Sequence, residues 1–323
     1  MLRPSIKIQI GQTVFTSVES VAITQTWEEM TDSAVFRLPS TLWKRGINLK
    51  TLFPYGTAVT IWMGVDRNLA EIFTGYVTSI KQDSISEFAC QDAMYLLKKS
   101  TVKSYFKSNA SLKQLLSDLE IPATANVDVP NLGTVKFQNV NKAQILDKLK
   151  EYGLYTFNRN GLQVGFPYLL TGSEYKFYFN GAKASIIDNS LSYEEVEVNQ
   201  IYLKSTSFLA DGSNIVLYSY YLNGNIVSST EKPGDGDSRN AFFYGLLYSE
   251  LKQVSEERLR KISYDGYSGT FSTFILPKIY FGDKVMLIDN RYVEREGTYL
   301  VKGVERTYST GGARQTITLD AKV

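Results

Sequence analysis

Residues 55–61 read YGTAVTI, and residues 281–287 read FGDKVML. In both stretches an aromatic residue and a glycine precede alternating apolar and polar residues, which is typical of a turn that leads into a β-strand. The loops around the two stretches differ in length, as loops do between equivalent strands of a repeated fold. We predict an internal duplication, against the alternative that any two sets of antiparallel strands look alike. The strands that follow lie at residues 73–77 and 88–91 in the first half and at residues 297–301 and 317–319 in the second, and both sets close on Asp-Ala.

The first hundred residues have the pattern of short β-strands. Ser5–Ile10 alternates strictly, with isoleucine at every second position, and Gly11-Gln12 forms a turn into Thr13–Phe15. Strands at this spacing predict a barrel or a sandwich over residues 1–100. Asp92 precedes a short helix, Ala93–Lys99. The other candidate strands are Val18–Trp27, Ala34–Leu38, Ala58–Met63, Ile72–Ile80 and Glu87–Gln91.

Residues 101–170 change to a mixed pattern that begins with two helices. Ser111 and Gln114 form a capping box before a stripe of leucines, and Pro122 ends that helix. Asn141 and Gln144 form a second capping box. Its helix has an apolar face at positions 145, 146, 149 and 152.

A hairpin completes this segment. Gly153 stands where the second helix should end, and Leu154–Asn158 and Leu162–Gly165 flank a turn at Asn160-Gly161. Residues 101–170 are therefore predicted to be a small α+β domain of helix, helix and hairpin.

Strands return from about residue 171. Tyr175–Phe179, Val196–Leu203 and Ile215–Leu222 are candidate strands, with turn signals at Asn180-Gly181, Asp211-Gly212 and Asn223-Gly224. Together with the strands between Thr270 and Val323, they predict a second β-barrel domain over residues 171–323.

An inserted loop and a long helix, at about residues 229–262, interrupt this second barrel. The loop is Glu231–Arg239, and the helix is predicted from about Asn240 to Ile262. Its buried side would be Phe243, Leu247, Leu251 and Val254, and its solvent-facing ion pairs would be Glu256–Arg260 and Glu257–Lys261.

Composition limits the class of protein. Hydrophobic residues make up 43% and charged residues 21%, as in soluble globular proteins, and 22 Tyr and 17 Phe favour sheet. A net charge of +2 indicates neither stable nucleic-acid binding nor a polybasic membrane patch. Apolar runs reach about eight residues (Ala241–Tyr248), so we expect a soluble protein without a cleaved signal. A single cysteine, Cys90, excludes an internal disulfide and fits folding in a reducing cytoplasm.

The sequence offers little for catalysis or cofactor binding. It has no histidine, which removes the commonest general base and metal ligand. Glu28-Glu29 and Glu194-Glu195 are candidate paired carboxylates, but neighbouring residues of a strand point to opposite faces. Asp235 and Asp237 lack the ligand spacing of a calcium loop, so a solvated linker is favoured.

Three other candidates are also favoured as structural. Gly234 and Gly236 are not followed by the Lys-Ser/Thr of a phosphate loop. Cys90 reads as a buried strand residue rather than a reactive thiol. The cluster Tyr218-Ser219-Tyr220-Tyr221 could stack on a sugar, but its strand spacing favours packing.

The order of these elements resembles the baseplate hub proteins of phage tails, including the late control protein D group. The clearest match is residues 139–165: the polar N-cap Asn141, an amphipathic helix, Glu151-Tyr152-Gly153, the aromatic strand Tyr155-Thr156-Phe157, the turn Asn160-Gly161 and a return strand. Residues 73–80, 281–285 and 299–304 look like strands of the family's first and last barrels. Each motif is weak alone, and residues 171–195 and 229–240 match no part of the family.

The resemblance implies a structural subunit rather than an enzyme, without catalytic, cofactor-binding or metal-binding residues. Two tail-tube-like antiparallel β-barrels would flank the helix-helix-hairpin unit and build a ring that joins the tail tube to a central spike or tip. The implied partners are copies of itself, a tail-tube protein and a spike or tip protein, with no stable nucleic-acid binding and no membrane. The implied location is the baseplate of a virion tail or contractile injection system, assembled in the bacterial cytoplasm.

The resemblance and the duplication together predict a homotrimer with pseudo-sixfold character, because a tube of this kind is built from hexameric rings and three chains of two barrels supply six. Tyr76, Tyr299 and Tyr308 are the residues expected near such interfaces, and Ala58–Met63 and Lys284–Asp289 should occupy equivalent positions.

Two other classes of function stay open. A carbohydrate- or receptor-binding tail protein is favoured by the many tyrosines, and glycan binding would support it. A cell-wall hydrolase would release peptidoglycan fragments, but the lack of histidine disfavours it.

Overall fold

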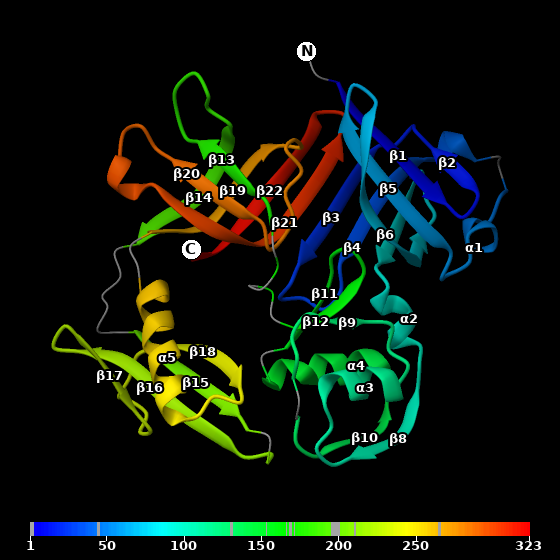
Figure 1. The fold of residues 1–323 in the computed structure, drawn as a ribbon. Helices are drawn as coiled ribbons and strands as arrows, with labels where there is room; N and C mark the ends of the chain where they lie inside the picture. The colour runs from blue at the N-terminus through cyan, green and yellow to red at the C-terminus, as the bar shows by residue number, and fades with distance from the viewer. Residues whose placement is uncertain are drawn as a thin grey trace.

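The computed structural model describes residues 3–43, 46–129, 132–152, 154–165, 167, 170, 172–194, 201–209, 211–263 and 266–323, apart from the side chains at 151, 152, 194, 257, 260, 261 and 321. The chain is mainly β, as predicted. In Figure 1 the N-terminal and C-terminal halves lie side by side, and two smaller units lie below them.

The N-terminal half is an antiparallel sheet with one aliphatic and aromatic core. Alternate residues of its strands are buried, including Ile8, Ile23 and Phe36, and the rings of Phe36 and Phe88 stack with centroids 5.0 Å apart. All the strands predicted here are present. They are β1 (Pro4–Ile10), β2 (Thr13–Phe15), β3 (Ser20–Thr26), β4 (Ser33–Pro39), β5 (Ala58–Val65), β6 (Asn68–Lys81) and β7 (Ile85–Gln91), with short helices η1 (Ser40–Leu42), α1 (Leu49–Leu52) and α2 (Met94–Lys98).

The α+β unit follows its local signals. Both predicted capping boxes are present, at Ser111 with Gln114 and at Asn141 with Gln144. The hairpin turn has left-handed backbone angles at Asn160 and Gly161 (φ 55° and 105°), which Asn and Gly tolerate best. The predicted helix end at Gly153 lies outside the described residues. The elements are β8 (Val102–Lys107), α3 (Leu112–Asp118), β9 (Thr124–Ala125), β10 (Val135–Val140), α4 (Lys142–Lys148), η2 (Leu149–Tyr152), β11 (Tyr155–Asn158) and β12 (Leu162–Gly165).

The C-terminal half has its own core, with Phe177, Phe271, Val285 and Val301 fully or nearly fully buried. Five of its strands pair antiparallel, and β13 joins β20 in parallel. The strands are β13 (Glu174–Tyr178), β14 (Ile186–Glu194), β19 (Gly266–Phe274), β20 (Lys284–Ile288), β21 (Gly297–Ser309) and β22 (Gly312–Lys322), with the short helix η5 (Val293–Arg295) before β21.

The segment between β14 and β19 is a separate four-stranded sheet with one helix. The strands expected to begin at Val196 and to span Ile215–Leu222 belong to this sheet and not to the sheet of the C-terminal half; residues 196–200 lie outside the described part. The inserted unit, residues 201–262, is therefore larger than the predicted 229–262. It consists of β15 (Ile201–Phe208), β16 (Asn214–Leu222), β17 (Asn225–Ser229), β18 (Asp237–Tyr244) and α5 (Tyr248–Ile262).

The predicted start of the long helix is wrong. Residues 237–244 form β18, which pairs in parallel with β15, so the predicted loop ends before Asp237 and the helix begins at Tyr248. Phe243 therefore packs from a strand, and Leu247 is 60% exposed. The buried face of α5 is Leu251, Ser255 and Leu259, with Val254 half-buried. Short apolar runs do not distinguish strand from helix, and here the pairing with β15 decides.

The predicted ion pairs on α5 cannot be followed in full, because the side chains at positions 257, 260 and 261 are not described. The Glu256 carboxylate accepts a hydrogen bond from Ser228 Oγ (3.1 Å) and lies 4.0 Å from Lys252 Nζ.

The two halves repeat the same strand order. In the N-terminal half the order across the sheet is β1-β5-β6-β7-β4-β3, and in the C-terminal half it is β13-β20-β21-β22-β19-β14. The predicted equivalence of β5 and β20 is therefore confirmed in the sheet order. The two halves differ at one pairing, since β1 is antiparallel to β5 and β13 is parallel to β20.

The repeat extends to single hydrogen bonds. Gly56 N–H donates to the Val77 carbonyl (2.8 Å), and Val77 N–H donates to the Thr57 carbonyl (2.9 Å). The same pair joins Gly282, Val301 and Asp283, at 2.8 Å each. Both glycines have positive φ (91° and 80°), and in both halves a register shift follows directly after the valine. The two aromatic-Gly turns therefore occupy equivalent places.

The halves flank the α+β unit in sequence, but in space they pair directly with each other. Strand β3 forms an antiparallel ladder with β21, which joins both halves in one 13-stranded sheet. None of the described helices is both long and apolar enough to cross a membrane.

Candidate functional site at the junction of the two halves

The junction is a backbone ladder that is sealed by side chains from both halves. Thr26 to Ser20 of β3 pair with Gly303 to Ser309 of β21. Ile275, from the C-terminal half, is buried in the core of the N-terminal half, and Tyr308 packs against that core. The contact between the halves is therefore part of the folded core rather than a loose domain contact.

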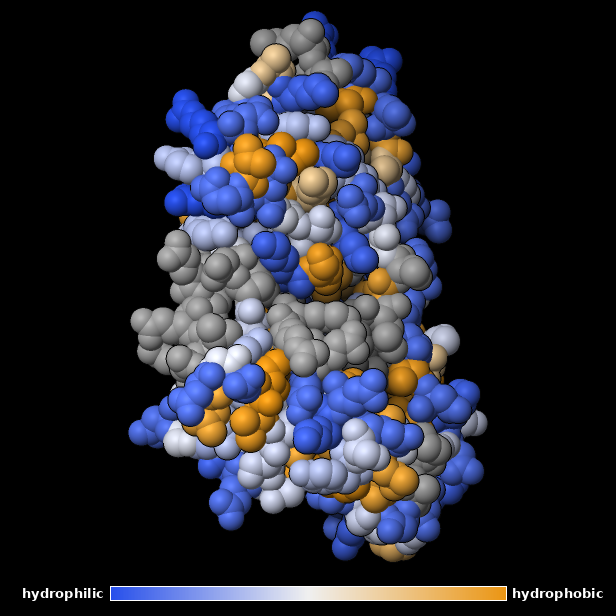
Figure 2. All heavy atoms as spheres, turned by 60° about the vertical axis from the view of Figure 1, so that its left-hand side comes forward, coloured by the Kyte–Doolittle hydropathy of each residue, from blue (hydrophilic) through white to orange (hydrophobic). Residues whose placement is uncertain are grey.

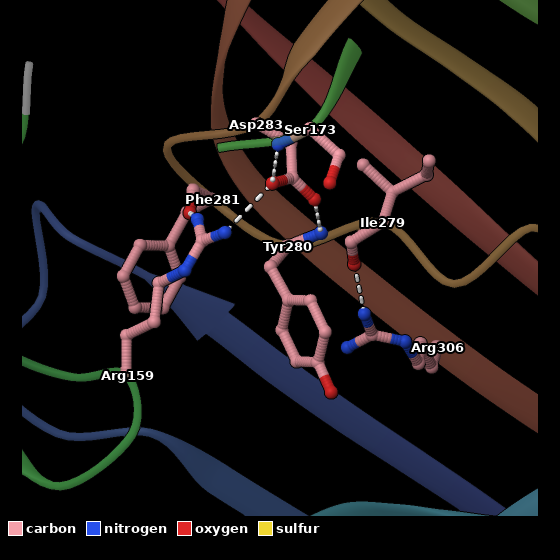
Figure 3. Close-up of polar contacts among 7 residues, drawn as sticks. All are labelled: Arg159, Ser173, Ile279, Tyr280, Phe281, Asp283 and Arg306. Atoms are coloured by element: carbon pink, nitrogen blue, oxygen red, sulfur yellow. Dashed lines mark hydrogen bonds and ion pairs between the residues drawn. The ribbon is translucent and has the colours of Figure 1, made fainter. Parts of the chain in front are cut away.

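A fully buried arginine stands at the centre of this junction. The Arg306 guanidinium donates to Gln25 Oε1 (2.5 Å) across the ladder and to the carbonyl of Ile279. It also lies over the ring of Tyr280, 5.2 Å from the centroid; both side chains are drawn in Figure 3. Burial lowers the pKa of Arg306 to about 10, so the group remains a cation at neutral pH.

Gln25 connects the Arg306 guanidinium to a buried carboxyl group through hydrogen bonds. Gln25 Nε2 donates to Asp32 Oδ2 (3.1 Å), and Asp32 is 4% exposed. Burial, helped by the nearby Asp92 carboxyl, raises the pKa of Asp32 to about 8. Burial also raises the pKa of Asp92, to about 6. At neutral pH Asp32 is therefore mostly protonated, and the charge state of the junction changes between about pH 6 and 8.

The α+β unit is fixed to this junction by an ion pair. Arg159, in the β11–β12 turn, donates to Asp283 Oδ1 (2.7 Å) and to the carbonyl of Phe281. Asp283 also accepts from the backbone N–H groups of Ser173 (3.0 Å) and Tyr280 (2.8 Å) (Figure 3). Gly282 has φ +80°, so this turn favours glycine for its backbone angles, and a Cβ there would also lie 2.8 Å from Leu170 Cδ1.

A polar hollow of about 370 Å³ lies where the three units meet. Asp32 accepts a hydrogen bond from Gln25, and Arg159 pairs with Asp283, whereas the side chain of Glu71 is exposed. The hollow therefore belongs to the packing of the junction and offers no set of free reactive groups. Its lining includes Gln25, Asp32, Glu71, Arg159, Tyr280 and Asp283.

Of the two carboxylate doublets, the structure describes the side chains of Glu28 and Glu29 only, and both are exposed. Glu28 is exposed and pairs with Lys302 Nζ (2.7 Å), and Glu29 is exposed in the turn after β3. The side chain of Glu194 and all of Glu195 lie outside the described part. Asp237, at the start of β18, pairs with Arg239 (3.2 Å), and Asp235 is exposed. Within the described ranges, no three acidic or cysteine side chains gather closely enough to hold a metal ion.

The other candidates are packed residues. Cys90 is 1% exposed, and burial raises the pKa of its thiol, which keeps it in the unreactive protonated form. Tyr221 packs in the core under α5, and the ring of Tyr218 contacts Tyr202, with centroids 6.1 Å apart. The tyrosine cluster is thus built into the inserted sheet.

The three tyrosines expected at interfaces take different places. Tyr299 is fully buried, and its hydroxyl accepts from the Tyr267 backbone N–H (2.9 Å), so the prediction that it lies at an interface is wrong. Tyr76 stacks on Tyr95 within the N-terminal half. Tyr308 does lie at an interface, the one between the two halves of the same chain.

Sequence reasoning missed the Arg306–Gln25–Asp32 chain. Arg306 lies two residues from both Val304 and Tyr308, on the face of β21 that turns inward. A charged residue at an inward position of a strand was therefore the available signal.

No family model and no curated protein matches this sequence. Solved structures do match over nearly its whole length. A tail protein from Neisseria meningitidis MC58 is similar at 13% identity, with a TM-score of 0.61, over 99% of this chain and 97% of that one. The 43 kDa tail protein of prophage MuSo2 from Shewanella oneidensis is similar at 12% identity, with a TM-score of 0.60, over 98% and 97%.

A third similar structure comes from a secretion system. The Escherichia coli c3393 protein, described as a component of the type VI secretion system with structural similarity to the T4 tail proteins gp27 and gp5, matches at 11% identity and a TM-score of 0.58. It covers 97% of this chain and 76% of that one. At such identities the likeness establishes the fold. The chain has the fold of phage tail proteins and of this injection-machine component.

Proposed function

We propose that this protein is a structural hub subunit of a phage tail or a related injection machine, in which it forms a ring that joins the tail tube to the central spike or tip. The resemblance to late control protein D and the fold shared with tail proteins both support this role. The protein acts by assembly, not by catalysis, and it works in the baseplate after folding in the bacterial cytoplasm.

The repeated strand order is the observation that carries the proposal. Each chain presents the same six-stranded unit twice, side by side and joined by the β3–β21 ladder. A ring of three chains then presents six similar units, which suits a partner with sixfold symmetry. Closed rings are also the usual outcome of a repeated head-to-tail contact.

The partners follow from this placement: two further copies, a tube protein on one side of the ring and a spike or tip protein on the other. One similar structure is the Francisella PdpA-VgrG complex, with a TM-score of 0.56; the match covers all of this chain and 58% of that one. Complexes of that kind support a contact between this fold and other injection-machine components.

The mass and symmetry of the assembly test the proposal. Light scattering and electron microscopy of the purified chain, alone and co-expressed with the spike and tube proteins of its own gene cluster, should find a closed trimer of about 109 kDa, three times 36.4 kDa. A stable dimer or tetramer, or a chain that stays monomeric with those partners present, would contradict it.

A further inference from the structure

Among the residues that the structure describes, two strand edges have no partner at places where their counterparts in the other half are paired. Strand β3 pairs with β4 on one side and with β21 on the other, whereas within the described residues its counterpart β14 pairs with β19 alone. Residues 303–309 of β21 pair with both β22 and β3, whereas residues 79–81 of β6 pair with β7 alone. The described part of the chain therefore has a second copy of each edge of the internal junction, one on β14 and one on β6, and neither is paired there.

Equivalent residues can be assigned from the ladders. The shared hydrogen bonds and register shifts match Val77 with Val301, which places Lys81 at the position of Glu305. Phe36 of β4 pairs with Phe88, and Phe271 of β19 pairs with Ile317, so Phe36 and Phe271 are equivalent. The residues that pair with them on the other side lie in β3 and β14, and counting along these two strands makes Ser192 equivalent to Thr24. Thr24 and Glu305 lie opposite each other in the internal junction.

We propose that β14 of one copy pairs antiparallel with residues 79–81 of β6 in a second copy, in the register of the internal junction, with Ser192 opposite Lys81. The inference rests on the proposed ring and specifies its contact. Each copy then donates one edge and receives another, so the contact is head-to-tail and closes only as a ring.

The exposure of the side chains agrees with this register. Ser192 and Lys81 are exposed, as Thr24 and Glu305 are, and Ile80 is buried like its counterpart Val304. A shift by one residue would invert this alternation on both strands. This agreement covers Ile80, Lys81 and Ser192, whereas Ser79 and Asn189 are exposed at positions where their counterparts Gly303 and Val21 are buried.

The receiving edge also keeps the shape of the internal junction. Gln82 occupies the position of Arg306, and its Nε2 donates to the carbonyl of Ile47 as Arg306 donates to the carbonyl of Ile279. In both halves a side chain of the edge strand thus donates a hydrogen bond to a backbone carbonyl of the segment that precedes the equivalent strand, β5 or β20.

The proposed surfaces also carry exposed apolar side chains. Ile187 on β14 and Phe274 on β19 are 36% and 63% exposed, and Leu42 and Leu52, in the segment that leads into β5, are 38% and 49% exposed. Figure 2, which brings forward the side of Figure 1 that carries β14, shows apolar residues in separate patches instead of one continuous apolar face. Such a surface suits a contact centred on backbone pairing with apolar flanks.

Engineered disulfides test the register directly. A chain with Lys81→Cys and Ser192→Cys should form intermolecular disulfides on mild oxidation, giving dimers and covalent trimers on a non-reducing gel, because opposite residues of an antiparallel pair have a suitable Cα separation. A mixture of the two single variants should stop at dimers. The matched control Lys81→Cys with Ser190→Cys, two residues out of register, should link about tenfold less, since the shift exceeds the span of a disulfide.

A positive control comes from the internal junction. Thr24→Cys with Glu305→Cys should form an intramolecular disulfide under the same conditions, which shows that the oxidation works and that exposed cysteines at such positions leave the fold intact. The native thiol of Cys90 is buried and is present in every variant, so it does not affect the comparison between them.

The outcomes separate the contact from the ring. If light scattering finds a trimer and the positive control links, but Lys81→Cys/Ser192→Cys gives no more product than the shifted pair, the proposed contact is wrong while the hub ring stands. If the chain forms no trimer even with its tube and spike partners, both the contact and the ring are wrong.

Discussion

The side chains of Arg306, Gln25 and Asp32 connect the two halves by a chain of hydrogen bonds that runs from a guanidinium to a carboxyl group. All three are almost completely buried, so the protonation states of Arg306 and Asp32 affect the stability of the junction. Single buried residues therefore determine how the junction responds to pH and how firmly each core is packed.

Asp32→Asn should make the protein less sensitive to alkaline pH. Because burial raises the pKa of Asp32 from 3.8 to about 8, the folded state holds a proton that the unfolded state has lost. This contribution to stability is complete below about pH 4 and is lost as pH rises towards 8. Asparagine stays neutral, so the stability of the variant relative to wild type should rise across this range, by on the order of 5 kcal/mol between pH 4 and pH 8.5.

Thermal unfolding at pH 5 and pH 8.5 measures this difference. Asp235→Asn, at an exposed position, is the matched control and should shift little at either pH. An Asp32→Asn effect that is the same at both pH values would show that Asp32 does not titrate in this window.

Leu149→Ala should destabilise the α+β unit. Leu149 is 2% exposed and packs with Leu115, Ile145 and Leu146 in one core. Truncating a buried leucine removes contacts and leaves a cavity, which costs about 2–5 kcal/mol. Urea unfolding measures the change; Leu96→Ala, at a position 48% exposed, is the control and should cost much less. Unchanged unfolding of the Leu149 variant would contradict the packing.

At the scale of elements, the β11–β12 hairpin matters because its turn reaches out of its own unit. Arg159 extends from that turn to Asp283 and Phe281 in the C-terminal half. The hairpin therefore holds the α+β unit against the paired halves, and the hydrogen-bonding capacity of Asp283 is used both by this arginine and by the turn around Gly282.

Arg159→Ala should loosen this docking. The Arg159 and Asp283 side chains are 15% and 2% exposed, so the charge-assisted hydrogen bond is worth about 2 kcal/mol. Arg37→Ala is the control, because the Arg37–Glu87 pair has a similar separation (2.8 Å) but a side chain that is 54% exposed, and it should cost less than about 1 kcal/mol. Hydrogen exchange should quicken in residues 155–165 in the first variant only; equal protection in both would argue against the docking role.

At the scale of the whole molecule, the inserted unit sits at a place where the chain can be shortened. Glu194 and Gly266, which border the insertion, lie directly opposite each other in the β14–β19 ladder. In the N-terminal half the equivalent strands β3 and β4 are joined by a short loop. The insertion therefore extends one connection of the repeated unit and leaves its strand order unchanged.

Replacing residues 195–265 by a turn of about two to four residues should leave a folded chain that still forms the ring, because such a turn suffices for two antiparallel neighbours. The chain should lose some stability, since Phe242 and Tyr244 of β18 pack against the core of the α+β unit. Light scattering and thermal unfolding of the shortened chain measure both effects. A monomeric but folded product would show that the insertion takes part in assembly.

Local sequence patterns are sufficient to predict the individual elements and the repeat. The capping boxes at Ser111 and Asn141 and the turn at Asn160-Gly161 are satisfied within a few residues, and strict alternation fixes which face of a strand is buried. The two aromatic-Gly turns were recognisable because a positive φ at Gly56 and Gly282 restricts the residue type at those positions.

How these elements combine depends instead on contacts between distant parts of the chain. Residues 240–244 became a strand because β15 offered an edge to pair with, and Tyr299 became a core residue because its hydroxyl found the Tyr267 backbone. The joining of the halves through β3 and β21, and the burial of Arg306 beside Gln25, depend on partners more than 270 residues apart in sequence. Contacts of this kind produce no pattern among neighbouring residues in the sequence, because each residue contacts a partner that is close to it only in the folded chain.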